Sequence, residues 1–210
     1  DVFINRNYPV NPINIGVATF DGLDSIGRPR NLSSETVHGS SDYLTSRPID
    51  LSNLSEVYLS FYLQSTGLGN EPEFNDIFML EFLDADSVWQ IIWDTTGYSL
   101  SDFEKINITI NENTFLHNAF QFRFHNKATL SGNFDHWHID NVLLTDDLLL
   151  FNDIEDVAFV YETSQMLNFY SSIPWKHFDQ NRAVYMASNM DTWVRNNYMT
   201  TQSVDYSYDI

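Results

Sequence analysis

Apolar and polar residues alternate with a period of two through much of the first 147 positions, a pattern that indicates β-strands. The alternation is clearest in AFQFRFHN, residues 119–126, where three phenylalanines share one face and polar side chains share the other. We expect one side of this strand to lie on a core and the other in water. Four more segments are rich in β-branched and aromatic residues and are predicted to be strands: residues 57–64, 76–84, 88–94 and 105–110.

Two earlier segments, VATFDG at 17–22 and DYLTSRPIDLS at 42–52, are predicted to be edge strands. Pro48 supports this assignment because proline cannot donate a hydrogen bond to a central ladder. The segment SGNFDHWHIDNVLL, residues 131–144, is predicted to be the closing strand. Short strands with turn residues at intervals of roughly ten positions are typical of sandwiches and jelly rolls. The predicted fold is therefore all-β, with one antiparallel jelly-roll β-sandwich over residues 14–147.

Residues 148–210 are aromatic and alternating, but this stretch is short for an independent β-domain. We predict a linker followed by the start of a second β-rich domain that is truncated in this chain. This stretch is too short to enclose its aromatic side chains in a core of its own. We therefore expect them to dock on another protein or on the remainder of a larger chain. These residues are Tyr161, Phe169, Tyr170, Trp175, Tyr185 and Trp193.

Charge and cysteine content narrow the function classes. The chain has 29 acidic and 10 basic residues, a formal net charge of -19, which disfavours nucleic acid and anionic membranes and attracts cations such as calcium. No cysteine is present, which excludes disulfides, thiolate metal sites and cysteine catalysis. No apolar run approaches the roughly 20 residues of a membrane helix. Because position 1 is aspartate rather than methionine, we expect a processed chain or a fragment.

The chain resembles a MAM-like or concanavalin-like jelly-roll domain of large secreted or outer-surface Bacteroidota proteins. The resemblance covers residues 14–147 and is carried by VATFDGLDSIGRPRN, SSDYLTSRPIDLSNLSEVYLSFYLQSTGLGNEPEFNDIFMLEF and FRFHNKATLSGNFDHWHIDNVLL, with LSGNFDHWHIDNV as the most specific part. It implies an extracellular or outer-membrane location, type 9 secretion, and a role in gliding or adhesion. It implies no established enzymatic activity, so we expect a non-catalytic module that acts in protein assembly or adhesion.

The resemblance also implies a structural calcium ion. In similar modules an Ile-Asp-Asp/Asn-Val phrase on the last strand lies near a calcium ion and an acidic residue of the first strand. HIDNV supplies Asp140 and TFDG supplies Asp21, with Asp135 and Asp24 as further ligands. An oxygen-only site of this kind suits calcium. The alternative is that these carboxylates only cap turns.

The two histidines His136 and His138 are two residues apart, so in a strand they share a face, a spacing that some zinc sites use. A zinc site would need a third ligand, for which His125 is available. We favour the simpler interpretation, in which both histidines lie on the solvent face while Trp137 and Ile139 fill the core.

A glycan site is the alternative function. Trp89 and Trp93 are four residues apart in one predicted strand, so they are expected to face the same way and could form a stacking platform for a sugar. The competing interpretation places both in the core with Ile91. This alternative would make the chain a carbohydrate-binding module of a polysaccharide-degrading system.

Catalysis is not expected. Asp76, Glu81 and Asp84 could supply the paired carboxylates of a glycoside hydrolase, but so acidic a chain produces such pairs by chance. A Ser/His/Asp triad would have no nucleophile-elbow motif to support it.

Overall fold

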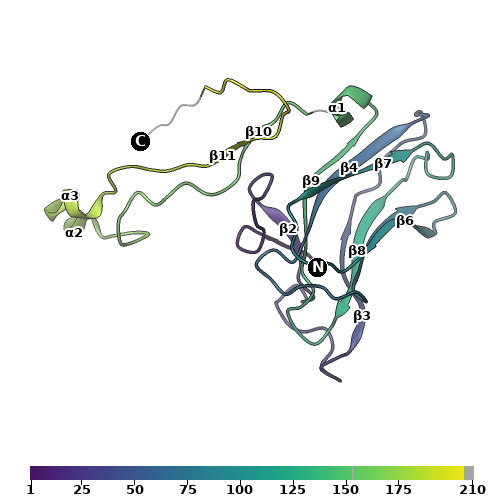
Figure 1. Cartoon of the computed structure of the whole chain (residues 1–210), viewed down its shortest axis with the longest axis horizontal. Helices are drawn as coiled ribbons and strands as arrows, with labels where there is room; N and C mark the ends of the chain where they lie inside the picture. The colour runs from purple at the N-terminus through teal and green to yellow at the C-terminus, as the bar shows by residue number, and fades with distance from the viewer. Residues whose placement is uncertain (153, 206–210) are drawn as a thin grey trace.

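A computed structural model describes residues 1–152 and 154–205 of the chain (Figure 1). In this range two antiparallel sheets face each other, and a tail with a small two-stranded ribbon extends away from them. No helix in the same range is long and apolar enough to cross a membrane. Residues 206–210, the end of the segment predicted at 148–210, lie outside the described residues.

The two facing sheets confirm the predicted all-β sandwich. Within the described residues, one sheet has five strands in the order β1 (Phe3–Asn5), β2 (Val17–Phe20), β9 (Trp137–Thr145), β4 (Val57–Ser65) and β7 (Glu104–Ile110). The other has four strands in the order β3 (His38–Thr45), β8 (Phe122–Thr129), β5 (Ile77–Leu83) and β6 (Trp89–Thr96). The closing strand β9 lies between β2 and β4, so segments from both ends of the sandwich sequence meet in one sheet.

The core fills the space between the two sheets, because alternate residues of each strand point inward. Phe61 of β4 meets Phe124 of β8 with ring centroids 4.8 Å apart, and Phe78 of β5 meets Trp137 of β9 at 5.4 Å. All four side chains are buried. Full burial of each large apolar side chain contributes roughly 1.5–3 kcal/mol, so these contacts between the sheets supply much of the stability.

One predicted position in the sheets is wrong. The segment at 17–22 forms β2, which is not an edge strand because it pairs with β1 on one side and β9 on the other. The sequence pattern did not predict β1, because a strand of three residues is too short to show a period. The prediction for 42–52 is confirmed in position, since β3 lies at the edge of its sheet, but the strand ends at Thr45, before Pro48.

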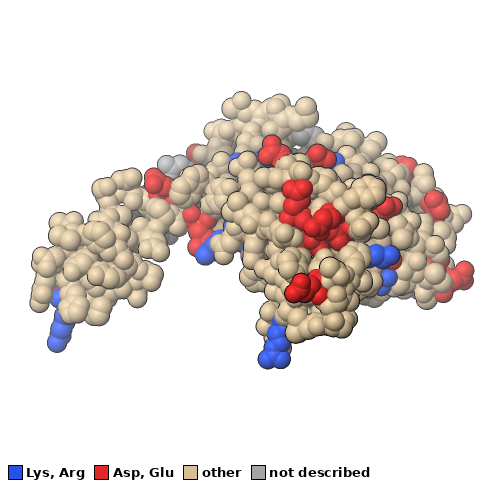
Figure 2. Space-filling view, turned by 60° about the horizontal axis from the view of Figure 1, so that its bottom comes forward, with Lys and Arg blue, Asp and Glu red and all other residues tan. Residues whose placement is uncertain are grey.

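The tail continues from β9 through α1 (Leu148–Asn152), β10 (Val157–Phe159), α2 (Trp175–Gln180), α3 (Arg182–Tyr185) and β11 (Val194–Asn196). Strands β10 and β11 pair antiparallel and form the ribbon. The intervening residues 163–192, here called the lobe, include α2 and α3 and lie far from the sandwich (Figure 1). Figure 2 shows that acidic side chains gather on the sandwich, whereas the visible face of the lobe is largely uncharged.

Candidate functional site

A β-bulge in β6 separates the two tryptophans that were predicted to share a face. Leu80 of β5 lies opposite Trp93, but the next residue, Glu81, lies opposite Ile91, so β6 carries one extra residue at this point. An extra residue in one strand reverses the alternation of side chains beyond it. Trp89 and Trp93 therefore point to opposite faces of the sheet, and the predicted shared platform is wrong.

The two rings have different surroundings. Trp93 packs against the core, with its ring centroid 5.7 Å from that of Phe61. Trp89 lies on the outer face, where the guanidinium carbon of Arg123 stands 4.2 Å from its ring centroid. Trp89 alone thus stays available as a contact residue of the predicted sugar site.

The outer face of the four-stranded sheet carries a row of aromatic and charged side chains, here called the aromatic face: Tyr43, Glu81, Trp89, Arg123 and His125. The Arg123 guanidinium lies 5.1 Å from the ring centroid of Tyr43 as well as above Trp89. Its Nε and Nη2 donate to the two carboxylate oxygens of Glu81 at 2.6 and 3.1 Å. This bidentate pair fixes the guanidinium plane between two rings.

His125 supports this arrangement from below. Its ring stacks on that of Tyr43, with centroids 4.1 Å apart and an angle of 13° between the planes. Burial lowers the pKa of His125, while the nearby carboxylate of Glu81 opposes that shift. Tyr43 is 40% exposed above it. The ring of Tyr43 therefore lies flat on the imidazole of His125 and is partly open to solvent.

The aromatic face can hold a ligand by two kinds of contact. The rings of Tyr43 and Trp89 offer apolar surface for C–H groups. Between them, Arg123 supplies N–H donors and Glu81 supplies acceptors with fixed orientation. The alternation in 119–126 already placed Arg123 and His125 on the outer face, but His125 is buried there beneath Tyr43 instead of lying in water. The alternation could not show that Tyr43 and Trp89 stand in the same row, because that depends on the strand order.

Three carboxylates form a second cluster at one end of the sandwich. One ligand atom from each of Glu73, Asp76 and Asp135 lies within 4.8 Å of the others. The pKa of Asp135 is raised to about 6, mainly by burial and also by the neighbouring carboxylates, against a backbone hydrogen bond that lowers it. His38 Nε2 is 2.8 Å from Asp76 Oδ1. Carboxylates this close repel one another, so a cation would stabilise them, and an oxygen-only set suits calcium.

The predicted calcium ligands are only partly together. Asp135 belongs to this cluster, but Asp21 and Asp140 do not approach each other. Phe20 lies opposite Trp137, which places Asp21 beside the start of β9, whereas Asp140 follows Trp137 by three residues along that strand. Asp21 Oδ1 accepts a hydrogen bond from the backbone N–H two residues later, as expected of the turn-capping alternative.

Asp140 fastens the N-terminal segment, residues 6–16, to the outer face of the five-stranded sheet. Its Oδ2 accepts hydrogen bonds from the backbone N–H groups of Ile13 at 3.1 Å and Asn14 at 2.9 Å. Gln64 of β4 adds two more, since Val10 N–H donates to its Oε1 and its Nε2 donates to the Val10 carbonyl, both at 2.9 Å. Asp140, which the HIDNV motif suggested as a calcium ligand, therefore binds the backbone of the N-terminal segment instead.

This covering segment, together with the loop at 66–70, also buries the two histidines near the start of β9. The prediction that His136 and His138 face solvent is wrong, because their exposed fractions are 1% and 0%. Thr19 Oγ1 lies 2.8 Å from His138 Nδ1, and His138 Nε2 lies 3.2 Å from the carbonyl oxygen of Thr66. The carbonyl can only accept, so Nε2 carries the proton and Nδ1 accepts from Thr19. Burial lowers the pKa of His138 to about 4, which keeps it neutral.

The zinc alternative fails for a related reason. His136 and His138 lie on the outer side of the five-stranded sheet, beneath the N-terminal segment and the loop at 66–70, whereas His125 lies on the outer face of the four-stranded sheet. The core separates them, so the three imidazoles do not gather around one point.

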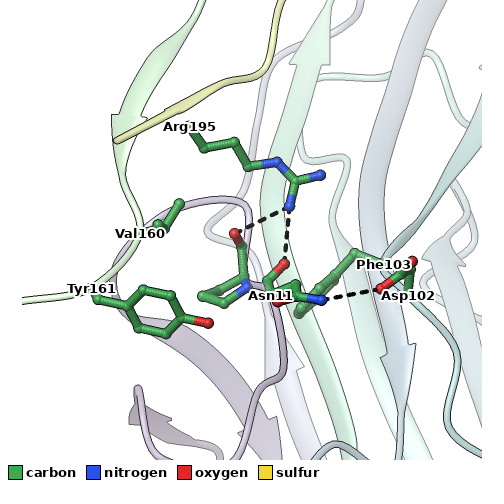
Figure 3. Close-up of a pocket in the computed structure, with 7 residues that line it drawn as sticks. Asn11, Asp102, Phe103, Val160, Tyr161 and Arg195 are labelled. Carbon is green, nitrogen blue, oxygen red and sulfur yellow. Dashed lines mark hydrogen bonds between the residues drawn. The ribbon is translucent and has the colours of Figure 1, made fainter. Parts of the chain in front are cut away.

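A pocket of about 350 Å³ opens where the tail meets the sandwich (Figure 3). It is here called the joint pocket. Three parts of the chain contribute to it: the N-terminal segment, the loop before β7, and the ribbon with its flanking residues. The residues that matter for its chemistry are Asn11, Pro12, Asp102, Phe103, Tyr161 and Arg195.

No family model matches the chain, and no curated protein matches its sequence. Several solved structures are similar in fold. One is a Family 16 Carbohydrate Binding Module-2, 9% identical, covering 69% of this chain and 85% of that chain with a TM-score of 0.40. Another is the enzymatically active domain of tailspike protein 4 of bacteriophage CBA120, at 12% identity, 69% and 17% coverage and a TM-score of 0.36.

A third is the CBM22-1 xylan-binding domain of Paenibacillus barcinonensis Xyn10C, 9% identical, covering 60% of this chain and 91% of that chain with a TM-score of 0.27. Likenesses of this size assign no family. The MAM-like resemblance and its link to type 9 secretion and gliding therefore stay predictions.

Proposed function

We propose that the sandwich is a non-catalytic module that binds a neutral polysaccharide along the aromatic face. The observation that carries this proposal is the Arg123 guanidinium, fixed by Glu81 between the rings of Trp89 and Tyr43. The row runs across the strands and combines apolar ring surface with donors and acceptors in fixed positions. A sugar chain offers the complementary surfaces, with C–H groups on the ring faces and hydroxyls at the ring edges.

Charge favours a neutral ligand over an acidic one. The charge of Arg123 is balanced by Glu81 at hydrogen-bond distance, so little of it remains to attract a uronate or sulfate group. The chain as a whole carries a formal net charge of -19 and repels polyanions. A neutral glycan avoids this repulsion and still satisfies both members of the ion pair.

The direct test replaces one ring of the aromatic face and one ring elsewhere. Migration in native gels containing soluble xylan, β-glucan, mannan or polygalacturonate would report binding, followed by calorimetry with the polysaccharide that retards the chain. We expect retardation by a neutral polysaccharide. Trp89→Ala should weaken it at least about tenfold, which is 1.4 kcal/mol. Trp175→Ala, which removes an exposed tryptophan of the lobe, serves as the matched control and should leave binding unchanged.

Two results would contradict the glycan proposal. One is the absence of retardation by every polysaccharide while the melting temperature shows a folded chain. The other is equal loss of binding in Trp89→Ala and Trp175→Ala. The proposal that the module is non-catalytic would be contradicted by saturable hydrolysis of a bound polysaccharide. That activity would have to be lost in Glu81→Gln or Asp135→Asn while the fold stays intact.

The tail favours a second function, assembly with another protein or with further parts of a larger chain. Phe169, Trp175 and Tyr170 in the lobe have exposed fractions of 68%, 63% and 53%. Such a concentration of exposed rings in one small segment is typical of a surface that a partner covers. Together with the MAM-like resemblance, this supports a role for the chain in a secreted or cell-surface protein.

Chemical cross-linking in the source cells would test this second function. We expect cross-linked partners through the lobe in the wild-type chain and their loss in a Phe169→Ser, Trp175→Ser variant. Sedimentation of the isolated chain as a monomer whose lobe rings are all protected from solvent oxidation would contradict it.

A further inference from the structure

The joint pocket is built from both parts of the molecule. Arg195 and Tyr161 belong to the tail, while Asn11, Asp102 and Phe103 belong to the sandwich and its N-terminal segment. Figure 3 shows Tyr161 on one side with its hydroxyl directed toward Asn11, and Asp102 and Phe103 on the other side. Its volume of about 350 Å³ is far more than a single water molecule needs.

The polar groups of the pocket are held in place by the backbone. Arg195 Nη1 donates to the carbonyl oxygens of Asn11 at 3.0 Å and Pro12 at 3.4 Å. The Asn11 side-chain amide donates to Asp102 Oδ1 at 3.5 Å. These bonds leave donors on Arg195, an acceptor oxygen on Asp102 and the hydroxyl of Tyr161 free for a ligand. Among the described residues, no carboxylate pairs with Arg195 and no group bonds to the Tyr161 hydroxyl.

The charges restrict the ligand class. A carboxylate or phosphate near Arg195 would meet Asp102 across the same pocket, and a cation near Asp102 would meet Arg195. A neutral ligand with hydroxyl groups satisfies both residues, because each hydroxyl can accept from the guanidinium and donate to the carboxylate. The rings of Phe103 and Tyr161 and the apolar face of Pro12 complement the C–H faces of a sugar ring.

We propose that the joint pocket is a second binding site, which takes a single neutral sugar residue such as the end of a glycan chain. This site shares no residue with the aromatic face and stands whether or not that face binds polysaccharide. Because its walls come from the ribbon and from the sandwich, a bound sugar bridges the two and holds the ribbon in place. Ligand binding should therefore protect the ribbon as well as occupy the pocket.

The test uses the whole chain labelled with ¹⁵N and a panel of methyl glycosides of neutral hexoses and pentoses, with methyl glucuronide as the acidic probe. We expect a neutral glycoside to shift the backbone amide signals of residues 11, 13, 102, 103, 160 and 161 in a saturable way; Pro12 has no N–H and gives no such signal. The acidic probe should bind at least about tenfold more weakly, a difference of 1.4 kcal/mol. The same neutral glycoside should slow proteolytic cleavage in the ribbon.

Two conservative variants separate binding from folding. Tyr161→Phe removes one hydroxyl, and Asp102→Asn removes the charge but keeps an oxygen for the Asn11 amide; each should weaken the neutral glycoside at least about fivefold, which is roughly 1 kcal/mol. Trp89→Ala is the control that should leave this site unchanged.

Three results would overturn the proposal: no glycoside shifts these signals, the acidic probe binds as well as the neutral ones, or the shifts are lost in Trp89→Ala and kept in Asp102→Asn. The third result would leave the aromatic face as the only sugar site. A failure of polysaccharide binding at the aromatic face would leave the glycoside titration interpretable, since the two assays report on different residues.

Discussion

In the sandwich, aromatic rings from facing strands pack against one another in the interior, whereas in the tail comparable rings stand in water. Phe78 and Phe124 are 0% and 1% exposed, while Phe169 and Trp175 are 68% and 63% exposed. Both regions alternate apolar and polar residues, so the pattern alone does not decide burial. The difference is that each sheet of the sandwich has a second sheet to pack against, and the ribbon has none.

The tail shows what a β-pattern does without a partner. A two-stranded ribbon is marginally stable by itself in water, and no residue from 161 to 205 is buried. The ribbon is held instead by polar contacts to the N-terminal segment, such as those of Arg195 and of Asn197, whose side-chain amide donates to the Ile13 carbonyl at 3.2 Å. Such contacts orient the ribbon but bury little apolar surface.

The largest expected effect is on the free energy of unfolding, when one phenylalanine from each region is replaced by alanine. Phe124→Ala opens a cavity between the sheets and should lower the free energy of unfolding by about 3–5 kcal/mol. Phe169→Ala removes an exposed ring and should change it by less than about 0.5 kcal/mol. Urea unfolding followed by tryptophan fluorescence measures both. A comparable loss from Phe169→Ala would show that the lobe packs in solution, which would break the comparison.

The second prediction places acid sensitivity in the sandwich. His138 has a pKa of about 4 in the folded chain against about 6.5 when unfolded. The unfolded state therefore takes up the proton first, and this contribution to stability, present above pH ~6.5, is lost as the pH falls toward ~4. Its full size is on the order of 3 kcal/mol.

The difference in the free energy of unfolding between the wild type and His138→Leu depends on pH through the titration of His138. Asp135, whose pKa is raised to about 6, acts in the opposite direction in the same pH range, but it is present in both chains and cancels. The difference should narrow as the pH falls. A difference that stays constant from neutral pH to pH ~4 would show that His138 is not held neutral by burial.

The stabilisation of the sandwich by calcium should depend on Asp135 but not on Asp140. Calcium at about 100 times its dissociation constant should stabilise the sandwich by roughly 2.7 kcal/mol. Asp135→Asn should remove this increment because it takes a ligand from the acidic cluster. Asp140→Asn should lower stability by loosening the N-terminal segment but keep the calcium response. Scanning calorimetry with calcium and with a chelator measures both, and a response that depends on Asp140 instead would restore the original pairing with Asp21.

The smallest expected effect concerns local opening. Mild proteolysis should cut first between residues 161 and 193 and leave a resistant fragment that contains all nine sandwich strands described here, because exposed segments with few buried contacts open at little cost. Mass spectrometry of the fragments gives the cut sites. First cuts inside β4 or β9 would contradict the division into a stable sandwich and a weakly held tail.

The local sequence pattern predicted which side of some strands faces the core, but it could not predict features that depend on strand order and register. The phenylalanine face of 119–126 predicted the core side of β8 because alternation in a regular strand needs no knowledge of the neighbours. The split between Trp89 and Trp93 could not be predicted, because a bulge depends on the register with β5. The same limit hid Tyr43, which reaches the aromatic face through the pairing of β3 with β8.

Burial of the histidines was missed for a different reason. HWHID alternates correctly, with Trp137 and Ile139 inward, and the error lay in assuming that the other face of β9 meets water. The residues that cover it come from positions 6–16 and from the loop at 66–70, which have no period of their own. Asp135 was recognised as acidic and close to the last strand, but its partners Glu73 and Asp76 are remote in sequence and carry no shared motif.

The position of β9 between β2 and β4 determines when the sandwich can be completed. The hydrogen bond from Ile13 to Asp140 joins residues 127 positions apart, and the one between Thr19 and His138 spans 119. Contacts of such long range form slowly, because the intervening chain must first be brought together. A growing chain therefore leaves β2 without its partner β9, and Ile13 and Asn14 without Asp140, until residues near 140 have been made. Until then the five-stranded sheet lacks its central strand, and a partly folded chain with an unpaired strand edge is open to misassembly and to chaperones.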